Sequence, residues 1–177
     1  MSMRREFTVV PPDLRLLMAA SGVGLLVGLV AIGFAAREAP MIWLAAIVMA
    51  VLVAASTAWL VRRRQVVLDG DLLTIAAGVN TARIRTADLD IAAARILDLA
   101  NDSTLKPGLK TFGSSMPGYR AGHFRLRNRS RAFVLLTDTT KVLALPERGG
   151  RMLLLSLERP QALLDALRTV AVAAARR

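Results

Sequence analysis

LLMAASGVGLLVGLVAIGFAA at residues 16–36 and MIWLAAIVMAVLVAASTAWLV at residues 41–61 are the two apolar runs that decide how this chain is organised. Neither run contains an ionisable residue, and only residues 37–40 separate them. At about 1.5 Å of rise per residue, each run forms a helix of roughly 31 Å, which matches the hydrocarbon thickness of a bilayer. Because one arginine at a bilayer centre costs about 3 kcal/mol, the absence of charge favours lipid surroundings. The two runs therefore predict a transmembrane helical hairpin at residues 16–61.

Basic residues flank both outer ends of the predicted hairpin, whereas the connecting loop carries one arginine and one glutamate. Cytoplasmic flanks are enriched in Lys and Arg, so we expect both termini on the cytoplasmic side. This predicts a multi-pass protein of the bacterial cytoplasmic (inner) membrane, with residues 1–15 as a cytoplasmic N-terminal segment. A signal peptide cleaved near residues 33–35 is the alternative, in which the second run still anchors the chain. The flanking arginines are Arg4, Arg5 and Arg15 before the first run and Arg62, Arg63 and Arg64 after the second.

Small residues recur every four positions in both runs, and such stripes let helix backbones approach closely. The pattern predicts helix packing, either within the hairpin or with a second copy or a partner's transmembrane helix. The residues concerned are Gly24 and Gly28 in the first run and Ala46, Ala50, Ala54 and Ala58 in the second.

Composition restricts what the rest of the chain can be. The chain has 177 residues, a formal net charge of +11 and no cysteine, which excludes disulfides and thiolate metal sites. Residues 65–177 suffice for one packed core, and this domain is itself basic. A basic module beside a cytoplasmic leaflet is attracted to anionic lipid headgroups. Nucleic acid is not expected, since the domain has no zinc-finger spacing or helix-turn-helix pattern.

The pattern after residue 64 is that of short strands broken by turn residues. Asp69-Gly70 predicts a type I′ hairpin turn, and residues 101–120, rich in Gly and Pro, are predicted to form a long loop. Residues 6–10 have strand-like composition and either pair with this domain or form a loose tail. The expected strands lie at residues 65–68, 71–76, 81–86, 94–99, 122–127, 132–137, 141–145 and 151–156.

Two further patterns complete the predicted domain. Alternation over residues 122–127 places Phe124 and Leu126 on one face and His123, Arg125 and Arg127 on the other, which predicts a hairpin with one solvent-exposed face. From Pro160 onward, apolar residues recur at helical spacing and predict a C-terminal amphipathic helix.

This order of elements is that of the pleckstrin-homology (PH) fold. Four stretches resemble the bacterial PH-like domain family of small membrane-anchored proteins. They are PGYRAGHFRL at residues 117–126, AFV at 132–134, TD at 137–138 and, near the C-terminal end of the family's domain, LLLS at 153–156. The resemblance covers residues 65–170 and implies a PH-like antiparallel β-barrel that serves as a binding or scaffolding module. Two positions depart from the family: Arg129 stands where a glycine is expected, and Arg159 where an acidic helix cap is usual. We therefore expect a membrane-anchored α+β chain.

No catalytic set emerges from the sequence. His123 is the single histidine, so a Cys-His pair is impossible and a Ser-His-Asp set would depend wholly on this residue. We expect a non-catalytic protein without metal or cofactor; an enzyme dependent on His123 is the remaining alternative.

Five arginines within twelve residues form the candidate binding site, because a guanidinium fork holds phosphate with two hydrogen bonds. They predict an interaction module that binds a protein partner at the cytoplasmic membrane face, with anionic lipid headgroups as a supporting contact. An anionic-lipid-surface sensor and a charged edge that prevents aggregation are the alternatives, and a homo-oligomer stays open. The arginines are Arg120, Arg125, Arg127, Arg129 and Arg131.

Overall fold

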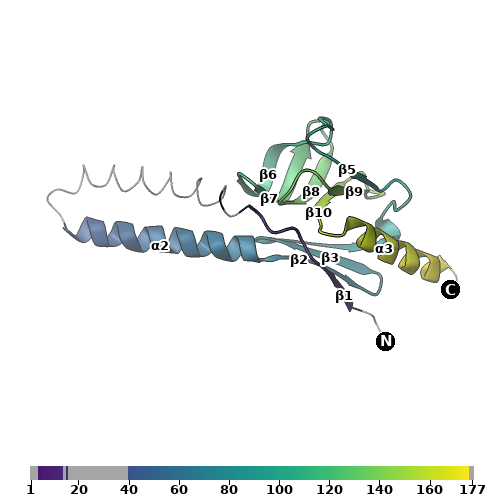
Figure 1. Cartoon of the computed structure of the whole chain (residues 1–177), viewed down its shortest axis with the longest axis horizontal. Coiled ribbons are helices and arrows are strands. Elements are labelled where there is room, and N and C mark those ends of the chain that lie inside the picture. Colours follow the sequence, from purple (N-terminus) through teal and green to yellow (C-terminus); the bar gives the residue numbers. More distant parts are fainter. Residues whose placement is uncertain (1–3, 14, 16–39, 176–177) are drawn as a thin grey trace.

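A long helix and a two-sheet β-domain make up the computed structural model, which describes residues 4–13, 15 and 40–175 (Figure 1). The helix, α2 (Pro40–Arg62), extends away from the sheets. Its segment Leu44–Arg62 is the one helix in the described part that is long and apolar enough to cross a membrane, and only 6% of it is buried. The predicted first span, with Gly24 and Gly28, lies outside the described residues, so the described structure contains no two-helix hairpin.

The first sheet is antiparallel throughout and has the order β1-β2-β3-β4. A short 3-10 helix, η1 (Thr86–Asp88), follows it. Alternation in β4, where every second residue is buried, turns one face of this sheet toward the core. The strands are β1 (Arg4–Phe7), β2 (Arg64–Asp69), β3 (Leu72–Ala77) and β4 (Asn80–Arg85).

The second sheet has the order β5-β9-β10-β8-β7-β6, and the helix α3 (Pro160–Ala175) closes the domain. As expected, Pro160 occupies the first helical position, where its missing N–H costs nothing. The strands are β5 (Arg95–Leu97), β6 (Pro107–Met116), β7 (Tyr119–Leu126), β8 (Arg131–Leu136), β9 (Val142–Pro146) and β10 (Met152–Ser156).

The strand arrangement differs from the predicted PH-like antiparallel β-barrel in two respects. The strands form two separate sheets, and β10 pairs with β8 in parallel. The parallel pair arises because the chain leaves β8, passes to β9 and returns as β10 in the space between them. The fold is a PH-like β-sandwich with a C-terminal helix.

The N-terminal segment pairs with the domain, which decides between the two alternatives for residues 6–10. β1 pairs with β2 in the first sheet, and Val9 forms a bridge to Leu157 just after β10. The Val10 N–H also donates to the Ser156 carbonyl at 3.2 Å. Residues before and after the apolar region are thus joined in one domain.

Both faces of the central strands are buried. In β8, Phe133 and Leu135 join the cluster between the two sheets, whereas Ala132 and Val134 join a second cluster on the opposite face. Leu99, from the segment after β5, belongs to that second cluster. The prediction of a hairpin with one exposed face is therefore wrong for β8, because the chain after β5 supplies apolar residues to its outer face.

The predicted loop at residues 101–120 is largely a strand. Ten of these residues form β6, which pairs with β7 through a ladder that is interrupted at two bulges. Gly113 faces Gly122 across this ladder. The glycines therefore permit close strand pairing and do not mark a loop.

The end of α2 is fixed to the β-domain. The Tyr119 hydroxyl donates to the Leu60 carbonyl at 3.2 Å, and Val61 belongs to the core between the sheets. β2 begins at Arg64, two residues after α2 ends. The turn between β6 and β7, which leads into Tyr119, consequently lies at the C-terminal end of α2.

Candidate functional site

β7 separates the five candidate arginines into two groups. Arg120 pairs with Leu136 at the start of the strand, whereas Arg125 pairs with Arg131 near its end. Positions 120 and 125 also lie on opposite faces of the strand, because side chains alternate. Arg120 is therefore apart from the other four, which we call the arginine tip. The arginine tip consists of Arg125, Arg127, Arg129 and Arg131.

The turn that carries the arginine tip is held by its own hydrogen bonds. Asn128 Oδ1 accepts from the Ser130 N–H at 3.0 Å and from the Ser130 hydroxyl at 2.6 Å. The Arg129 N–H donates to the Leu126 carbonyl at 2.9 Å. Arg129 has a φ of 68°, a conformation that glycine adopts without strain. This backbone conformation explains why a glycine was expected at position 129.

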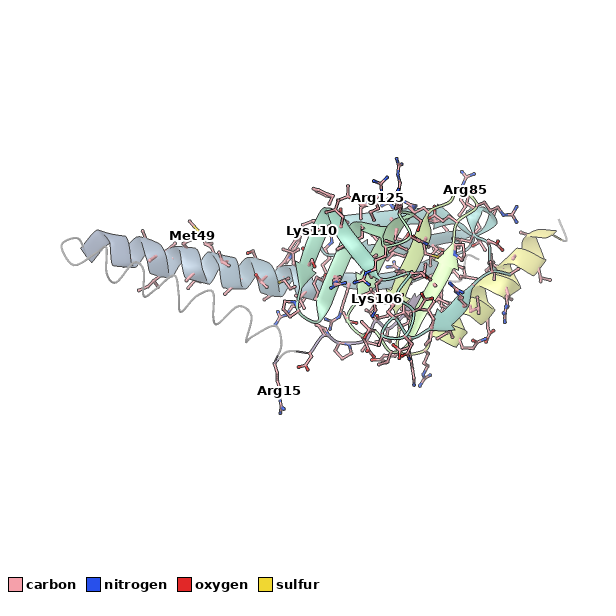
Figure 2. The ribbon with its side chains drawn as sticks, turned by 90° about the horizontal axis from the view of Figure 1, so that it is seen from above. Arg15, Met49, Arg85, Lys106, Lys110 and Arg125 are labelled. Atoms are coloured by element: carbon pink, nitrogen blue, oxygen red, sulfur yellow. The ribbon has the colours of Figure 1, made fainter. Side chains whose placement is uncertain are left out.

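The arginine tip is a concentrated and exposed positive charge. All four side chains are exposed. Among the described residues, Arg95, Arg151 and Arg168 form ion pairs with carboxylates, whereas no ion pair is seen at the arginine tip. Figure 2 shows Arg125 projecting from the side of the β-domain, on the same side as Arg85 of β4. The tip thus presents uncompensated cations to solvent.

Two exposed apolar side chains lie beside the arginine tip. Leu109 and Phe112 of the edge strand β6 are 70% and 63% exposed. Leu109 pairs with Arg125 and Phe112 pairs with His123, because a bulge between Lys110 and Phe112 restores the same face after three positions. Side chains at paired positions lie on one face, so aliphatic, aromatic and cationic groups adjoin. We call this surface the apolar–arginine face: Leu109, Phe112, His123, Arg125 and Arg131.

Sequence reasoning missed Leu109 and Phe112 because it assigned their segment to a loop. Strict alternation would put positions 109 and 112 on opposite faces, and the bulge hides their shared orientation. The usable signal was Pro117-Gly118, a turn dipeptide placed between two segments of similar length. Such a turn favours a hairpin of β6 with β7.

His123 packs against the core side of the sheet. Its ring meets the Phe133 ring edge-on, with centroids 5.1 Å apart. Burial, together with the nearby Arg151 guanidinium, lowers the pKa of His123 below its ordinary value of 6.5. The imidazole is therefore neutral at pH 7 and contributes an aromatic surface beside Phe112.

The four alanines of the small-residue stripe of α2 differ in their exposure to solvent. Ala46 and Ala50 are half-buried, and Ala54 and Ala58 are exposed. Helix packing along this stripe stays a prediction.

The described residues contain no group of three or more His, Cys, Asp or Glu side chains that could hold a metal ion.

Comparison with known proteins identifies the β-domain. A family model described as "Bacterial PH domain" matches residues 64–171, which is more than half of the chain. No curated protein and no solved structure matches the chain. The matched range begins at β2 and ends within α3, so it covers both sheets apart from β1. The chain belongs to the bacterial PH domain family.

Proposed function

We propose that this chain is a membrane-anchored, non-catalytic interaction module whose apolar–arginine face binds an acidic surface of a protein partner at the cytoplasmic face of the membrane. The observation that carries the proposal is the paired row Leu109–Arg125–Arg131 with Phe112 beside it. Arginine and large aromatic side chains dominate the binding energy of protein interfaces. Exposed together on an edge strand, they favour a docking surface over a merely solubilising edge.

The position of this face favours a protein over lipid as its ligand. Tyr119 contacts Leu60 at the end of α2, and Arg125 lies six residues further along β7, about 20 Å at 3.4 Å per residue. Screening reduces charge interactions over about 8 Å at physiological salt, so most of the attraction to headgroups is lost over such a distance. In Figure 2 Arg125 projects to the side of the β-domain and not along α2. A partner held in the same membrane can reach a lateral face.

Strand pairing supports a hairpin anchor. β1 precedes the apolar region and β2 follows it, yet the two strands pair in one sheet. Residues 4–7 and 64–69 therefore lie on the same side of any membrane. With α2 as one crossing, the chain needs a second crossing before Pro40, where the uncharged run at residues 16–36 stands. The flanking arginines favour the cytoplasm as the shared side.

Photo-crosslinking in cells tests the proposal on the full-length chain. A photoreactive amino acid at position 127, in the arginine tip beside the apolar–arginine face, should capture one discrete protein. The same group at position 159, outside both the tip and the face, should not. Phe112→Ser should reduce the captured protein at least tenfold, and Val172→Ser, which alters another exposed apolar residue, should leave it unchanged. Adducts with lipid alone would refute the protein partner and favour the lipid-surface sensor.

A further inference from the structure

Within the described residues the two sheets have four edge strands, and three of these are short or charged. Natural edge strands are commonly blunted in these ways, because their unpaired N–H and C=O groups otherwise recruit a further strand. β5 has three residues, β1 is the charged sequence RREF, and β4 exposes Arg83 and Arg85. The fourth edge strand, β6, has ten residues. Its length sets it apart from the other three.

Only the first half of β6 is protected against pairing with another chain. Pro107, Lys110 and two bulges interrupt this half. Residues 112–116, FGSSM, pair with β7 without interruption and contain neither a charged residue nor a proline. The second half of β6 is therefore an unprotected edge.

The turn between β6 and β7 fixes which backbone groups face this edge. Met116 and Tyr119 pair across a turn of two residues, so they exchange backbone hydrogen bonds with each other. Hydrogen-bonded and non-hydrogen-bonded pairs alternate along an antiparallel ladder, so the N–H and C=O groups of Gly113 and Ser115 point away from β7. Among the described strands, none lies on that side of β6. These groups are available to an added strand.

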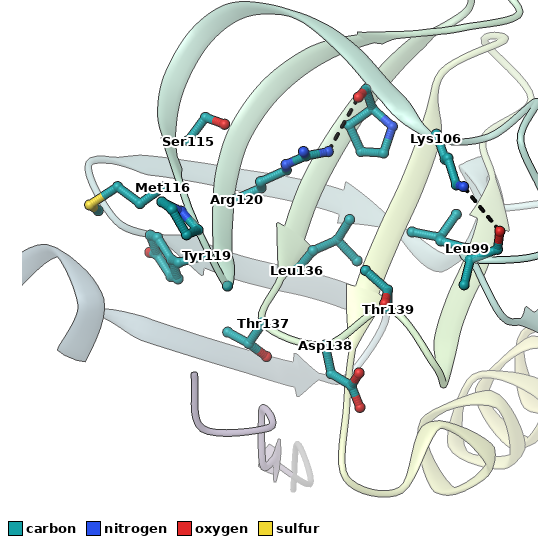
Figure 3. A pocket seen from close by; sticks show the side chains of 14 residues that line it. Leu99, Lys106, Ser115, Met116, Tyr119, Arg120, Leu136, Thr137, Asp138 and Thr139 are labelled. Carbon is teal, nitrogen blue, oxygen red and sulfur yellow. Dashed lines mark hydrogen bonds between the residues drawn. The ribbon is translucent and has the colours of Figure 1, made fainter. Parts of the chain in front are cut away.

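Positive charge stands behind this edge on both faces of the sheet. Phe112 lies on the apolar–arginine face, with His123 and Arg125 on the adjacent strand β7. Ser115 lies on the opposite face and pairs with Arg120. Both line a cleft near the end of α2 (Figure 3). A strand added to β6 would thus meet one arginine on each face.

We propose that the partner binds by adding an extended acidic segment to the free edge of β6 along residues 112–116. This inference rests on the proposed function and specifies how the partner is recognised. Main-chain hydrogen bonds hold the segment, and one of its apolar side chains packs beside Phe112. Its acidic side chains pair with Arg120 on one face and with Arg125 on the other. A second copy of this chain, with a net charge of +11, would instead bring like charge to the edge.

Ser115→Pro tests strand addition in cells, in the full-length chain with the photoreactive amino acid at position 127. Proline removes the N–H that faces the free edge but no hydrogen bond of the ladder with β7. Capture of the partner should fall about tenfold or more, because a backbone hydrogen bond is lost and the ring obstructs the edge. Ser115→Ala is the matched control, which keeps the N–H and should capture the partner as wild type does.

Two measurements separate binding from folding. Ser115→Pro should keep the far-UV circular dichroism spectrum of wild type in micelles, whereas Ser114→Pro removes an N–H that bonds to β7 and should unfold at a lower temperature. In the wild-type complex purified after crosslinking, the amides of Gly113 and Ser115 should exchange with deuterium about tenfold or more slowly than in the free chain. This second measurement needs no variant.

The outcomes distinguish strand addition from the proposed function. Wild-type capture by Ser115→Pro, or unchanged exchange at residues 112–116 in the complex, would overturn strand addition and leave the proposed function standing. Failure of the wild-type chain to capture any protein would overturn both. An adduct of two copies of this chain, or a captured segment with net positive charge, would overturn the acidic segment.

Discussion

Gly122→Ala tests whether the close pairing of β6 with β7 holds the apolar–arginine face in place. Gly122 has a φ of 119° and faces Gly113, whose φ is 145°. A Cβ at position 122 would lie 2.5 Å from the Phe112 carbonyl oxygen and 2.7 Å from both Asn80 Nδ2 and Gly113 Cα. Two of these three neighbours are backbone atoms of β6, so the clash cannot be relieved by a side-chain rotation.

The structure sets the size of the expected loss. The unfavourable φ costs about 1–3 kcal/mol, and forcing extra volume into a packed site costs about 1–3 kcal/mol. We therefore expect the free energy of unfolding to fall by about 2–6 kcal/mol, a large part of the roughly 5–15 kcal/mol that domains have. The nearest clashing atom belongs to Phe112, a residue of the apolar–arginine face. The Gly122→Ala variant should therefore also fail to capture the protein partner in the crosslinking experiment.

Far-UV circular dichroism of the full-length chain in micelles measures this loss. Tryptophan fluorescence is unsuitable, since both tryptophans belong to α2 and not to the β-domain. Gly149→Ala is the matched control, because a Cβ there meets nothing within 4 Å, and it should change stability by less than about 1 kcal/mol. If Gly122→Ala unfolds within about 1 kcal/mol of wild type, the argument from close strand approach is refuted.

Three further changes have defined outcomes. Arg129→Gly should raise the free energy of unfolding by about 0.5–1 kcal/mol, measured by denaturant titration, because it relieves a φ of 68° and loses part of that gain to backbone entropy. Tyr119→Phe removes the hydrogen bond to Leu60 and should cost about 1 kcal/mol, with faster proteolysis after α2; unchanged proteolysis would contradict the fixed junction. The pKa of His123 is lowered in the folded state, so the unfolded state takes up this proton first and stability should fall as the pH drops below 6.5. His123→Gln should remove that part of the pH dependence. If the free energy of unfolding of this variant varies with pH as in the wild type, the assignment to His123 is wrong.

Local sequence predicted most strands because turn residues interrupt short apolar runs at regular intervals. The first hairpin of the PH domain illustrates the remaining error. Asp69-Gly70 was expected at the centre of a type I′ turn, but Asp69 pairs with Leu72 and the central residues are Gly70 and Asp71. Gly70 has a φ of 59°, whereas Asp71 does not have a positive φ. A type I′ turn needs positive φ at both positions, so the glycine sets a different turn, shifted by one residue.

β6 could not be recognised from its own residues. Its glycines and prolines are typical of loops, and its two bulges break the alternation that identifies a strand. What makes it a strand is the ladder with β7, whose own pattern was recognised. The parallel placement of β10 beside β8 is non-local in the same way, because the local sequence of β10 indicates a strand but does not select its neighbour.

The arginine cluster shows why nearness in sequence did not predict a site. Arg125 follows Arg120 by five positions, which in a strand is an odd spacing and a displacement of about 17 Å. The first therefore lies in the cleft near α2, and the second lies on the apolar–arginine face beside Leu109. Since β6 and β8 pair with β7 on both sides, this strand cannot shift its register without breaking two ladders. Under the proposed function, this rigid strand carries one arginine beside the end of the anchor helix α2 and another on the face that binds the partner.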